Sequence, residues 1–203
     1  MLFRSGSPHQ YGCTYTALKE IVDTLETEDI ESEIYWIGNK PISDCIACGM
    51  CKEGKCAIND GVNEILAKID EYGAIIIGSP VYYASISGQL SSFLDRLFYA
   101  SKGKMQHKLG AAVVSARRAG TSSSLDQINK YFTISSMPIV SSTYWNQVHG
   151  NTPSDVKKDL EGLQTMRTLA RNLSWLLKAI ECAKENNITP PSLETKIRTN
   201  FIR

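Results

Sequence analysis

The sequence predicts a three-layer α/β fold built on a five-stranded parallel sheet. Residues 74–77 and 109–115 are short apolar runs rich in Ile and Val, typical of strands buried on both faces. Between such runs, apolar residues recur every three or four positions, which is the spacing of an amphipathic helix. Five strands that alternate with five helices indicate a parallel sheet covered by helices on both faces.

The predicted elements follow one another regularly along the chain. The strands are expected at residues 1–4, 33–37, 74–77, 109–115 and 138–143. The helices are expected around residues 14–25, 62–69, 90–98, 125–132 and 154–186. Pro190 and Pro191 prevent further helix. We therefore expect one domain over residues 1–187 and a tail over residues 188–203.

Composition excludes several functional classes. The chain has 203 residues, of which 42% are hydrophobic and 21% charged, and its net charge is only +1. This balance gives no reason to expect a nucleic-acid partner. No apolar run approaches the roughly 20 residues that span a bilayer, and no secretory signal is apparent. We expect a cytoplasmic protein without a membrane or nucleic-acid partner.

The first loop has the composition of a phosphate-binding site. The run SGSPHQYGCT supplies small residues and hydroxyl groups, among them Ser5, Ser7 and Thr14, just before a predicted helix. Amide donors at a helix N-terminus, together with hydroxyl groups, suit a phosphate. The loop matches neither the Walker pattern nor GxGxxG, and a simple capped turn is an equal alternative.

Two further loops follow buried strands. The run GSPVYYASISGQ, from Gly78, carries Tyr82 and Tyr83, which suit a flat ring system better than an ordinary connection requires. The third loop, ARRAGTSSS, begins at Ala116 and offers small residues and two arginines. In the strand order 2-1-3-4-5 the three loops converge on one crevice at the carboxyl edge of the sheet.

Four cysteines form a separate signal. Cys45, Cys48, Cys51 and Cys56 follow the pattern C-x2-C-x2-C-x4-C in a loop over residues 44–58. In a reducing compartment such clustering indicates metal or redox chemistry. Three thiolates within seven residues can surround an iron–sulfur cluster, and a fourth can complete it. Structural zinc fits this spacing less well, and free thiols are the remaining alternative.

The sequence resembles the flavodoxin-like NAD(P)H-dependent FMN reductases and, within them, the iron–sulfur flavoproteins. The resemblance rests on GSPHQYGCT, on GSPVYYASISGQLSSFLDR and on the cysteine run CIACGMCKEGKC, and it extends over nearly the whole chain. It departs at position 13, where relatives usually carry Asn instead of Cys.

The resemblance implies specific sites. The FMN phosphate would lie against Ser5, Ser7, Cys13 and Thr14. The isoalloxazine ring would lie against Pro80, Val81, Tyr82, Tyr83 and Ser85. The opposite ring edge would meet Ser115, Gly120 and Thr121. A [4Fe–4S] cluster would be bound by Cys45, Cys48, Cys51 and Cys56.

The functional hypothesis is therefore an FMN-dependent oxidoreductase that carries a [4Fe–4S] cluster and needs no catalytic side chain. It would pass electrons from NAD(P)H or ferredoxin to a quinone, a flavin or another acceptor. A cluster-free NAD(P)H-dependent FMN or quinone reductase and a non-enzymatic electron carrier are the alternatives. We also expect a homo-oligomer, a dimer or a tetramer, because Ile197, Phe201 and Ile202 would otherwise expose an apolar tail.

Overall fold

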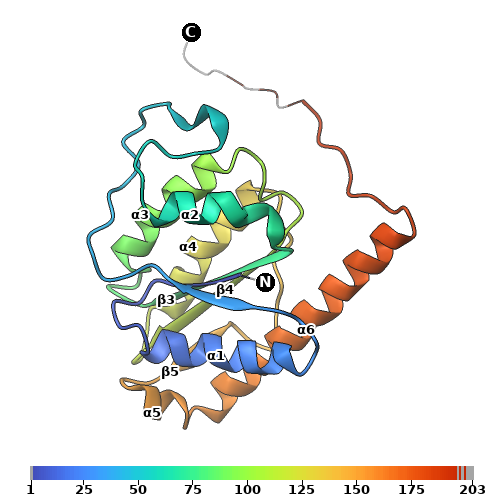
Figure 1. Cartoon of the computed structure of the whole chain (residues 1–203). Helices are drawn as coiled ribbons and strands as arrows, with labels where there is room; N and C mark the ends of the chain where they lie inside the picture. The colour runs from blue at the N-terminus through green and yellow to red at the C-terminus, as the bar shows by residue number, and fades with distance from the viewer. Residues whose placement is uncertain (1, 196, 198, 200–203) are drawn as a thin grey trace.

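A parallel sheet forms the centre of the molecule. The computed structural model describes residues 2–195, 197 and 199. Within them the strands lie in the order β2-β1-β3-β4-β5 (Figure 1). Their bounds are β1 (Leu2–Ser5), β2 (Glu33–Trp36), β3 (Ala74–Pro80), β4 (Leu109–Ala116) and β5 (Gln147–His149). The predicted α/β class with a parallel sheet is confirmed.

The middle of the sheet is buried on both faces. Ile75 and Ile77 of β3 pack into the core on one side, whereas Ala74 and Ile76 pack into the core on the other. Every residue of β4 is buried as well. This alternation follows from the two-residue period of a strand, and it explains why both runs are apolar throughout.

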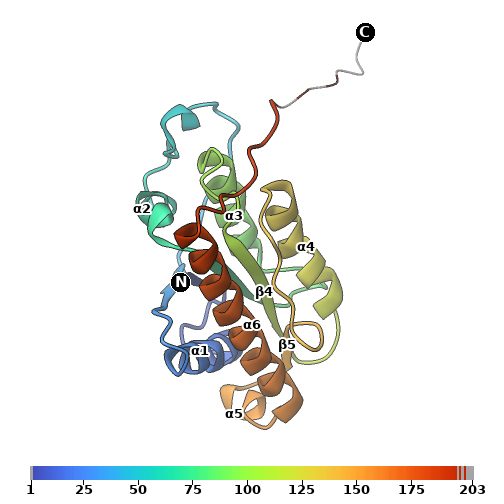
Figure 2. The same cartoon turned by 90° about the vertical axis from the view of Figure 1, so that its right-hand side faces the viewer.

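Helices cover both faces (Figure 2). One face is covered by three helices, α2 (Gly61–Lys68), α3 (Gly88–Ala100) and α4 (Thr121–Ile134). Two short 3-10 helices, η1 (Cys51–Glu53) and η2 (Ile69–Glu71), lie on the same side. The opposite face is covered by α1 (Cys13–Glu26), α5 (Pro153–Val156) and α6 (Leu160–Glu185). The three layers place the ends of the parallel strands, and the loops that follow them, along a common edge.

The predicted last strand at residues 138–143 is wrong. That segment makes one isolated bridge between Ile139 and Gly110, with hydrogen bonds from the Gly110 amide to the Pro138 carbonyl (2.9 Å) and from the Val140 amide to Gly110 (2.8 Å). Beyond it the Ser142 hydroxyl bonds to the Asn146 side chain at 2.6 Å, which closes a local loop. The chain returns to β4 only at β5.

The single helix predicted over residues 154–186 is also wrong. Thr152 and Asp155 form a capping box that starts the four-residue helix α5. Asp159 then accepts a hydrogen bond from the Gly162 amide and caps a new helix, α6. Two caps within eight residues explain the break. Cys182, which lies in the last turns of α6, is exposed, although its apolar character and position on an amphipathic helix predict a small core residue.

The described part of the chain contains no helix long and apolar enough to cross a membrane. After α6 the chain leaves the body of the molecule without regular structure (Figure 1). Ile197 is 88% exposed, whereas Phe201 and Ile202 lie outside the described residues.

Candidate functional site

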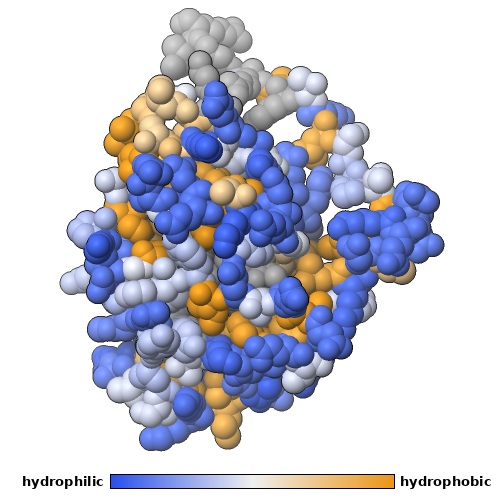
Figure 3. All heavy atoms as spheres, viewed as in Figure 1, coloured by the Kyte–Doolittle hydropathy of each residue, from blue (hydrophilic) through white to orange (hydrophobic). Residues whose placement is uncertain are grey.

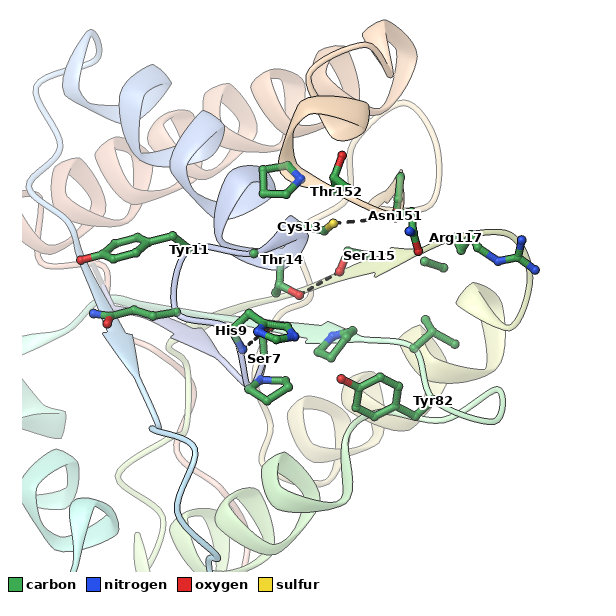
Figure 4. A pocket seen from close by; sticks show the side chains of 18 of the residues that line it. Ser7, His9, Tyr11, Cys13, Thr14, Tyr82, Ser115, Arg117, Asn151 and Thr152 are labelled. Carbon is green, nitrogen blue, oxygen red and sulfur yellow. Dashed lines mark hydrogen bonds between the residues drawn. The ribbon is translucent and has the colours of Figure 1, made fainter.

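A cleft of about 790 Å³ opens at the carboxyl ends of the strands, where the loops after β1, β3, β4 and β5 meet (Figure 4). This volume lies within the range of small-molecule sites, about 300–1,000 Å³. Seven of the residues predicted for a cofactor site line it: Ser7, Cys13, Thr14, Pro80, Val81, Tyr82 and Ser115. The structure thus brings these seven residues together in one cleft.

The loop after β1 forms one end of the cleft. Gly12 is the N-cap residue of α1 and provides no side-chain cap, so no side chain satisfies the first-turn amides there. A Cβ atom at position 12 would lie 3.1 Å from the Cβ atom of His9 and 3.4 Å from the Ser7 hydroxyl oxygen. The close approach and the uncapped amides make this end suitable for an anion.

One buried hydrogen bond ties this loop to the centre of the sheet. The hydroxyl oxygens of Thr14 and Ser115 are 2.8 Å apart, and both residues are buried (Figure 4). The Ser115 carbonyl in turn accepts a hydrogen bond of 3.0 Å from the Val81 amide. Ser115 therefore connects the first and second loops and fixes their separation.

The second loop turns sharply beside the cleft. Tyr83 and Ala84 have φ angles of +50° and +59°, a left-handed conformation that residues other than glycine rarely adopt. Two hydrogen bonds between the backbones of Tyr82 and Ser85, at 2.9 and 3.0 Å, close the turn. Gln127 of α4 holds it from below, because its side-chain oxygen accepts from the Ser85 hydroxyl at 2.7 Å. The turn keeps Tyr82 on the cleft wall.

The structure does not bring the other five predicted residues to the cleft wall. Ser5 is fully buried at the end of β1, and Thr121 is buried in the first turn of α4. Tyr83 points into solvent, and Ser85 faces α4. Gly120 packs against the turn instead, since a Cβ atom there would lie 2.7 Å from the Cα atom of Ala84.

Sequence reasoning missed several lining residues. Trp36, at the end of β2, reaches the cleft, and its indole nitrogen donates to the Ser7 carbonyl at 2.8 Å. Asn151 and Thr152 line the cleft after β5, and they were missed because the last strand was placed too early. Arg117 lies on the third loop at the cleft wall. A correct boundary for β5 would have revealed Asn151 and Thr152.

Cys13 lies in the cleft as a neutral thiol. Its sulfur donates to the Gly150 carbonyl at 3.7 Å (Figure 4). Burial raises the pKa of the Cys13 thiol, which the nearby Asp155 carboxylate reinforces. A neutral thiol beside an anion site avoids charge repulsion.

A second cavity contains the cysteines. Cys45, Cys48, Cys51 and Cys56 all line it, together with Ile58, Arg96 and Tyr99. Cys45 and Cys48 are exposed, Cys56 is half-buried and Cys51 is buried. Burial raises the pKa of Cys51, and the neighbouring sulfurs of Cys56 and Cys48 raise it further. Among the described residues, no three His, Cys, Asp or Glu side chains are already arranged as a metal-ligand set.

Arg96 of α3 holds this second cavity together. Its side chain is 1% exposed and forms an ion pair with Asp60 at 2.7 Å. Burial by itself lowers the pKa of Arg96, but hydrogen bonds to Asp60 and Cys56 outweigh burial and raise it above its usual value. The guanidinium therefore stays charged beside the cysteine sulfurs.

The two cavities are separate. The cysteine loop leaves β2 at the carboxyl edge of the sheet but then runs outward over α2 and α3 (Figure 1). Within the described part of the chain, the cleft and the cysteine cavity have no lining residue in common. A fifteen-residue loop has thus carried the cysteines away from the edge at which it begins.

The parallel sheet and the cleft at its carboxyl edge are typical of the flavodoxin-like class. A WrbA-like flavodoxin from Agrobacterium tumefaciens has the same fold, with a TM-score of 0.62 and 16% identity over 88% of this chain and 96% of that one. The sequence profile of the NADPH-dependent FMN reductases matches residues 1–152, and the chain belongs to this family.

Two curated relatives have names that report a second redox group. An iron-sulfur flavoprotein from Methanocaldococcus jannaschii is 37% identical over 186 residues, which are 87% of this chain and 96% of the relative. An iron-sulfur flavoprotein from Methanosarcina thermophila is 27% identical over 182 residues, with coverages of 87% and 94%. The resemblance stated from the motifs is confirmed, and the family implies an FMN-dependent oxidoreductase activity.

Proposed function

We propose that this protein is an FMN-dependent oxidoreductase that also carries a [4Fe–4S] cluster. It passes electrons from a reduced donor, NAD(P)H or ferredoxin, to a quinone, a flavin or another acceptor. The observation that carries the proposal is the presence of two distinct cavities: a cleft at the carboxyl edge of a flavodoxin-like sheet, and a second cavity lined by four cysteines.

The residues of the cleft suit FMN. The uncapped amides at the start of α1, with the hydroxyls of Ser7 and Thr14, would hold the phosphate. Pro80, Val81 and Tyr82 would lie against the ring, and Ser115 would fix the distance between the two ends. The loop is too short, and lacks the GxGxxG pattern, for a dinucleotide.

Bound FMN would supply hydride and single-electron transfer. The residues that line the cleft would bind and orient the ring. Among the described residues, the cleft wall contains no Ser–His–Asp arrangement and no carboxylate pair. Pro80 and Val81 would cover one side of the bound ring and shield it from water.

The cysteine cavity suits an iron–sulfur cluster by its donor set. Four soft sulfur ligands with no histidine or carboxylate among the wall residues are typical of iron–sulfur or zinc sites. The tight sequence spacing favours iron–sulfur over zinc. Metal sites often reach their final ligand arrangement only when the metal binds, which accommodates the exposed Cys45 and Cys48.

We also propose that the protein is a homo-oligomer, either a dimer or a tetramer, in which residues 188–203 pack on a neighbouring subunit. Ile188, Leu193 and Ile197 are 65%, 50% and 88% exposed in the single chain. Near the cysteines, Ile46 and Met50 are also exposed, and Figure 3 displays hydrophobic surface at that end of the molecule. In the single chain the flavin cleft and the cysteine cavity are separate, since they share no lining residue among those described. A neighbouring subunit would bring a second flavin cleft close to the cysteine cavity.

The decisive experiment is anaerobic purification followed by an absorption spectrum and by assays of iron and sulfide. We expect flavin bands above a broad absorption that dithionite bleaches. Heat release and chromatography of the flavin should yield FMN, and recovery of FAD would contradict the cleft assignment. Light scattering should detect an oligomer that dissociates when residues after Pro191 are deleted.

A cluster-free NAD(P)H-dependent FMN or quinone reductase is the alternative, since the described cysteines do not form a finished ligand set. Reconstituted protein with one FMN but neither iron nor sulfide would establish it. Oxidation of NAD(P)H with a quinone or free flavin as acceptor would distinguish either enzyme from a non-enzymatic electron carrier.

A further inference from the structure

We propose that Arg96 is the positioning residue of the cysteine cavity: it fastens both ends of the cysteine loop and, through its hydrogen bond to the Cys56 sulfur, sets the reduction potential of the cluster. The second half of this inference rests on the proposed function. The first half concerns the loop alone and is tested separately.

Arg96 uses every donor that it has. Its Nε–H group donates to the Cys56 sulfur at 3.3 Å. One terminal nitrogen donates to the Ser43 carbonyl at 3.2 Å and to Asp60 at 2.7 Å. The other donates to the Ile58 carbonyl at 3.0 Å and to the second Asp60 oxygen at 2.8 Å. A guanidinium has five N–H donors, and here all five are occupied.

These bonds close the loop at both ends. Ser43 lies two residues before the first cysteine, and Ile58 lies two residues after the last. One planar group therefore joins the two ends of the segment that contains all four sulfurs. The loop contains only the three-residue helix η1 as regular structure. Asn63 of α2 also holds its C-terminal end, because its side chain accepts from the Cys56 amide at 2.8 Å and donates to the Cys56 carbonyl at 2.9 Å. Arg96 joins this end to Ser43 at the other end.

A buried guanidinium is unusual and requires compensation. Transfer of a charged side chain from water is costly unless it is paired and hydrogen-bonded. Asp60 provides a two-point ion pair, but its side chain is 32% exposed, so water partly screens its charge. The positive charge of Arg96 is thus only partly neutralised by Asp60, and it still acts on the Cys56 sulfur in the cavity wall.

The charge and the N–H···S bond have a predictable effect on a cluster. Hydrogen bonds to the sulfurs and the net charge around a cluster set its reduction potential. Both features stabilise the additional negative charge of the reduced state. Arg96 should therefore raise the potential above the value that the four thiolates alone would give.

Three full-length variants test this inference. Arg96→Gln removes the charge and most of the N–H donors. Arg96→Lys retains the charge but loses the planar arrangement of five donors that reaches Cys56, Ser43, Ile58 and Asp60 together. Asp60→Asn retains the N-cap of α2, since Asn caps as well as Asp, but removes the negative charge beside Arg96. Arg167→Gln, which breaks a surface ion pair with Glu20 on the opposite face of the sheet, is the matched control.

The first readout is the midpoint potential after anaerobic reconstitution with iron and sulfide. We expect a lower potential in Arg96→Gln, a smaller decrease in Arg96→Lys, a higher potential in Asp60→Asn and no change in Arg167→Gln. A purely structural role would shift the Arg96 and Asp60 variants in the same direction, and that result would overturn the electrostatic part of the inference.

The second readout is amide hydrogen exchange over residues 43–60 in protein without metal. We expect exchange at least tenfold faster in both Arg96 variants than in the wild type, with FMN content and exchange in β3 and β4 unchanged. Unchanged exchange would overturn the fastening role. If the wild-type protein binds no iron, the proposed cluster is wrong, while this second readout still decides whether Arg96 fastens the loop.

Discussion

The cleft and the cysteine cavity are built in different ways. The cleft lies on the ends of parallel strands, and its walls are joined by buried bonds such as that between Thr14 and Ser115. The cysteine cavity lies in an irregular loop over α2 and α3. The buried side chain of Arg96 bonds to both ends of this loop, and Asn63 bonds to its C-terminal end. The fold itself creates the first site, whereas individual side chains create the second.

This difference predicts that the two sites respond independently to substitution. α3 is the element that both share: its N-cap Ser87 donates to the Gly6 carbonyl at 2.8 Å in the first loop, and Arg96 lies more than two turns further along. The predictions below either separate the two sites or test this shared element.

The largest expected effect is at the cysteine loop. Cys48→Ser should abolish bound iron, because a serine oxygen is a poor substitute for a soft sulfur ligand. FMN content should stay near that of the wild type, since Cys48 is not among the residues that line the cleft. Iron, sulfide and flavin assays on the same sample measure both.

Cys182→Ser is the control for this experiment. Cys182 is exposed on α6, far along the chain from the cysteine loop, so its replacement should change neither iron nor FMN. Loss of FMN together with iron in Cys48→Ser would mean that the two sites are not independent.

The second prediction concerns the strained turn beside the cleft. Gly120→Ala should lower the free energy of unfolding by about 2–3 kcal/mol, because position 120 has a φ of +89° and a Cβ atom would lie 2.7 Å from Ala84. Displacement of the turn should also weaken FMN binding. Urea unfolding and flavin titration measure the two effects.

Gly103→Ala is its matched control. Gly103 has nearly the same φ, +88°, but a Cβ atom there would meet only the flexible Gln106 side chain at 3.5 Å. It should therefore cost stability through the backbone alone, about 1 kcal/mol, and leave FMN binding unchanged. Equal flavin affinities in the two variants would contradict the role assigned to Gly120.

Thr14→Val should weaken FMN binding about tenfold, which corresponds to about 1.4 kcal/mol. The valine removes one hydroxyl from the phosphate end and leaves the buried Ser115 hydroxyl without this partner. Iron content should not change. Thr168→Val, on α6 outside the cleft, should leave the flavin affinity as it is.

The smallest effect concerns α3 and appears only at high pH. Burial and a hydrogen bond of 2.5 Å to Asp95 raise the pKa of Tyr131 to about 12, from an ordinary value of 10.0. The folded state thus keeps this proton at pH values where the unfolded state has lost it. The stability from Tyr131 is fully present below pH 10 and is lost as the pH rises through 12.

Tyr131→Phe removes this dependence. Between pH 10 and 12 the wild-type unfolding midpoint should fall more steeply than that of Tyr131→Phe, and at neutral pH both proteins should bind FMN and iron alike. Thermal unfolding at half-unit pH steps measures the difference. Parallel curves would show that the bond to Asp95 on α3 contributes nothing to stability.

Residues placed by the strands of the sheet could be predicted from the sequence, whereas residues placed by distant side-chain contacts could not. The buried runs of β3 and β4 indicated the sheet. Thr14 lies after β1, Tyr82 lies in the loop after β3, and Ser115 lies at the end of β4, so all three are at the carboxyl edge that the strand order predicts. The position of β5 was missed, because residues 138–143 have the apolar and β-branched composition of a strand but pair only once. Asn151 and Thr152 were missed with it.

Other features depend on contacts that no local pattern encodes. Tyr83 was assigned to the ring because of its residue type, yet the left-handed turn directs it into solvent. Arg96 stands at the end of a recognised motif, but its role depends on Ser43, Ile58 and Asp60, which are 36–53 residues away in sequence. Side-chain contacts over such separations become visible only in three dimensions.

Because Arg96 bonds to both Ser43 and Ile58, we expect that residues 44–57 can be removed from this fold or inserted into it as one segment. Two chain ends held by one guanidinium lie close together, so a few Gly and Ser residues should bridge the gap if residues 44–57 are excised. The reverse transplant should also work: a relative without the loop would need the segment itself, an arginine at the position of Arg96 and an acid at that of Asp60. Acquisition or loss of the second redox centre would then require no change in the sheet or in the flavin cleft.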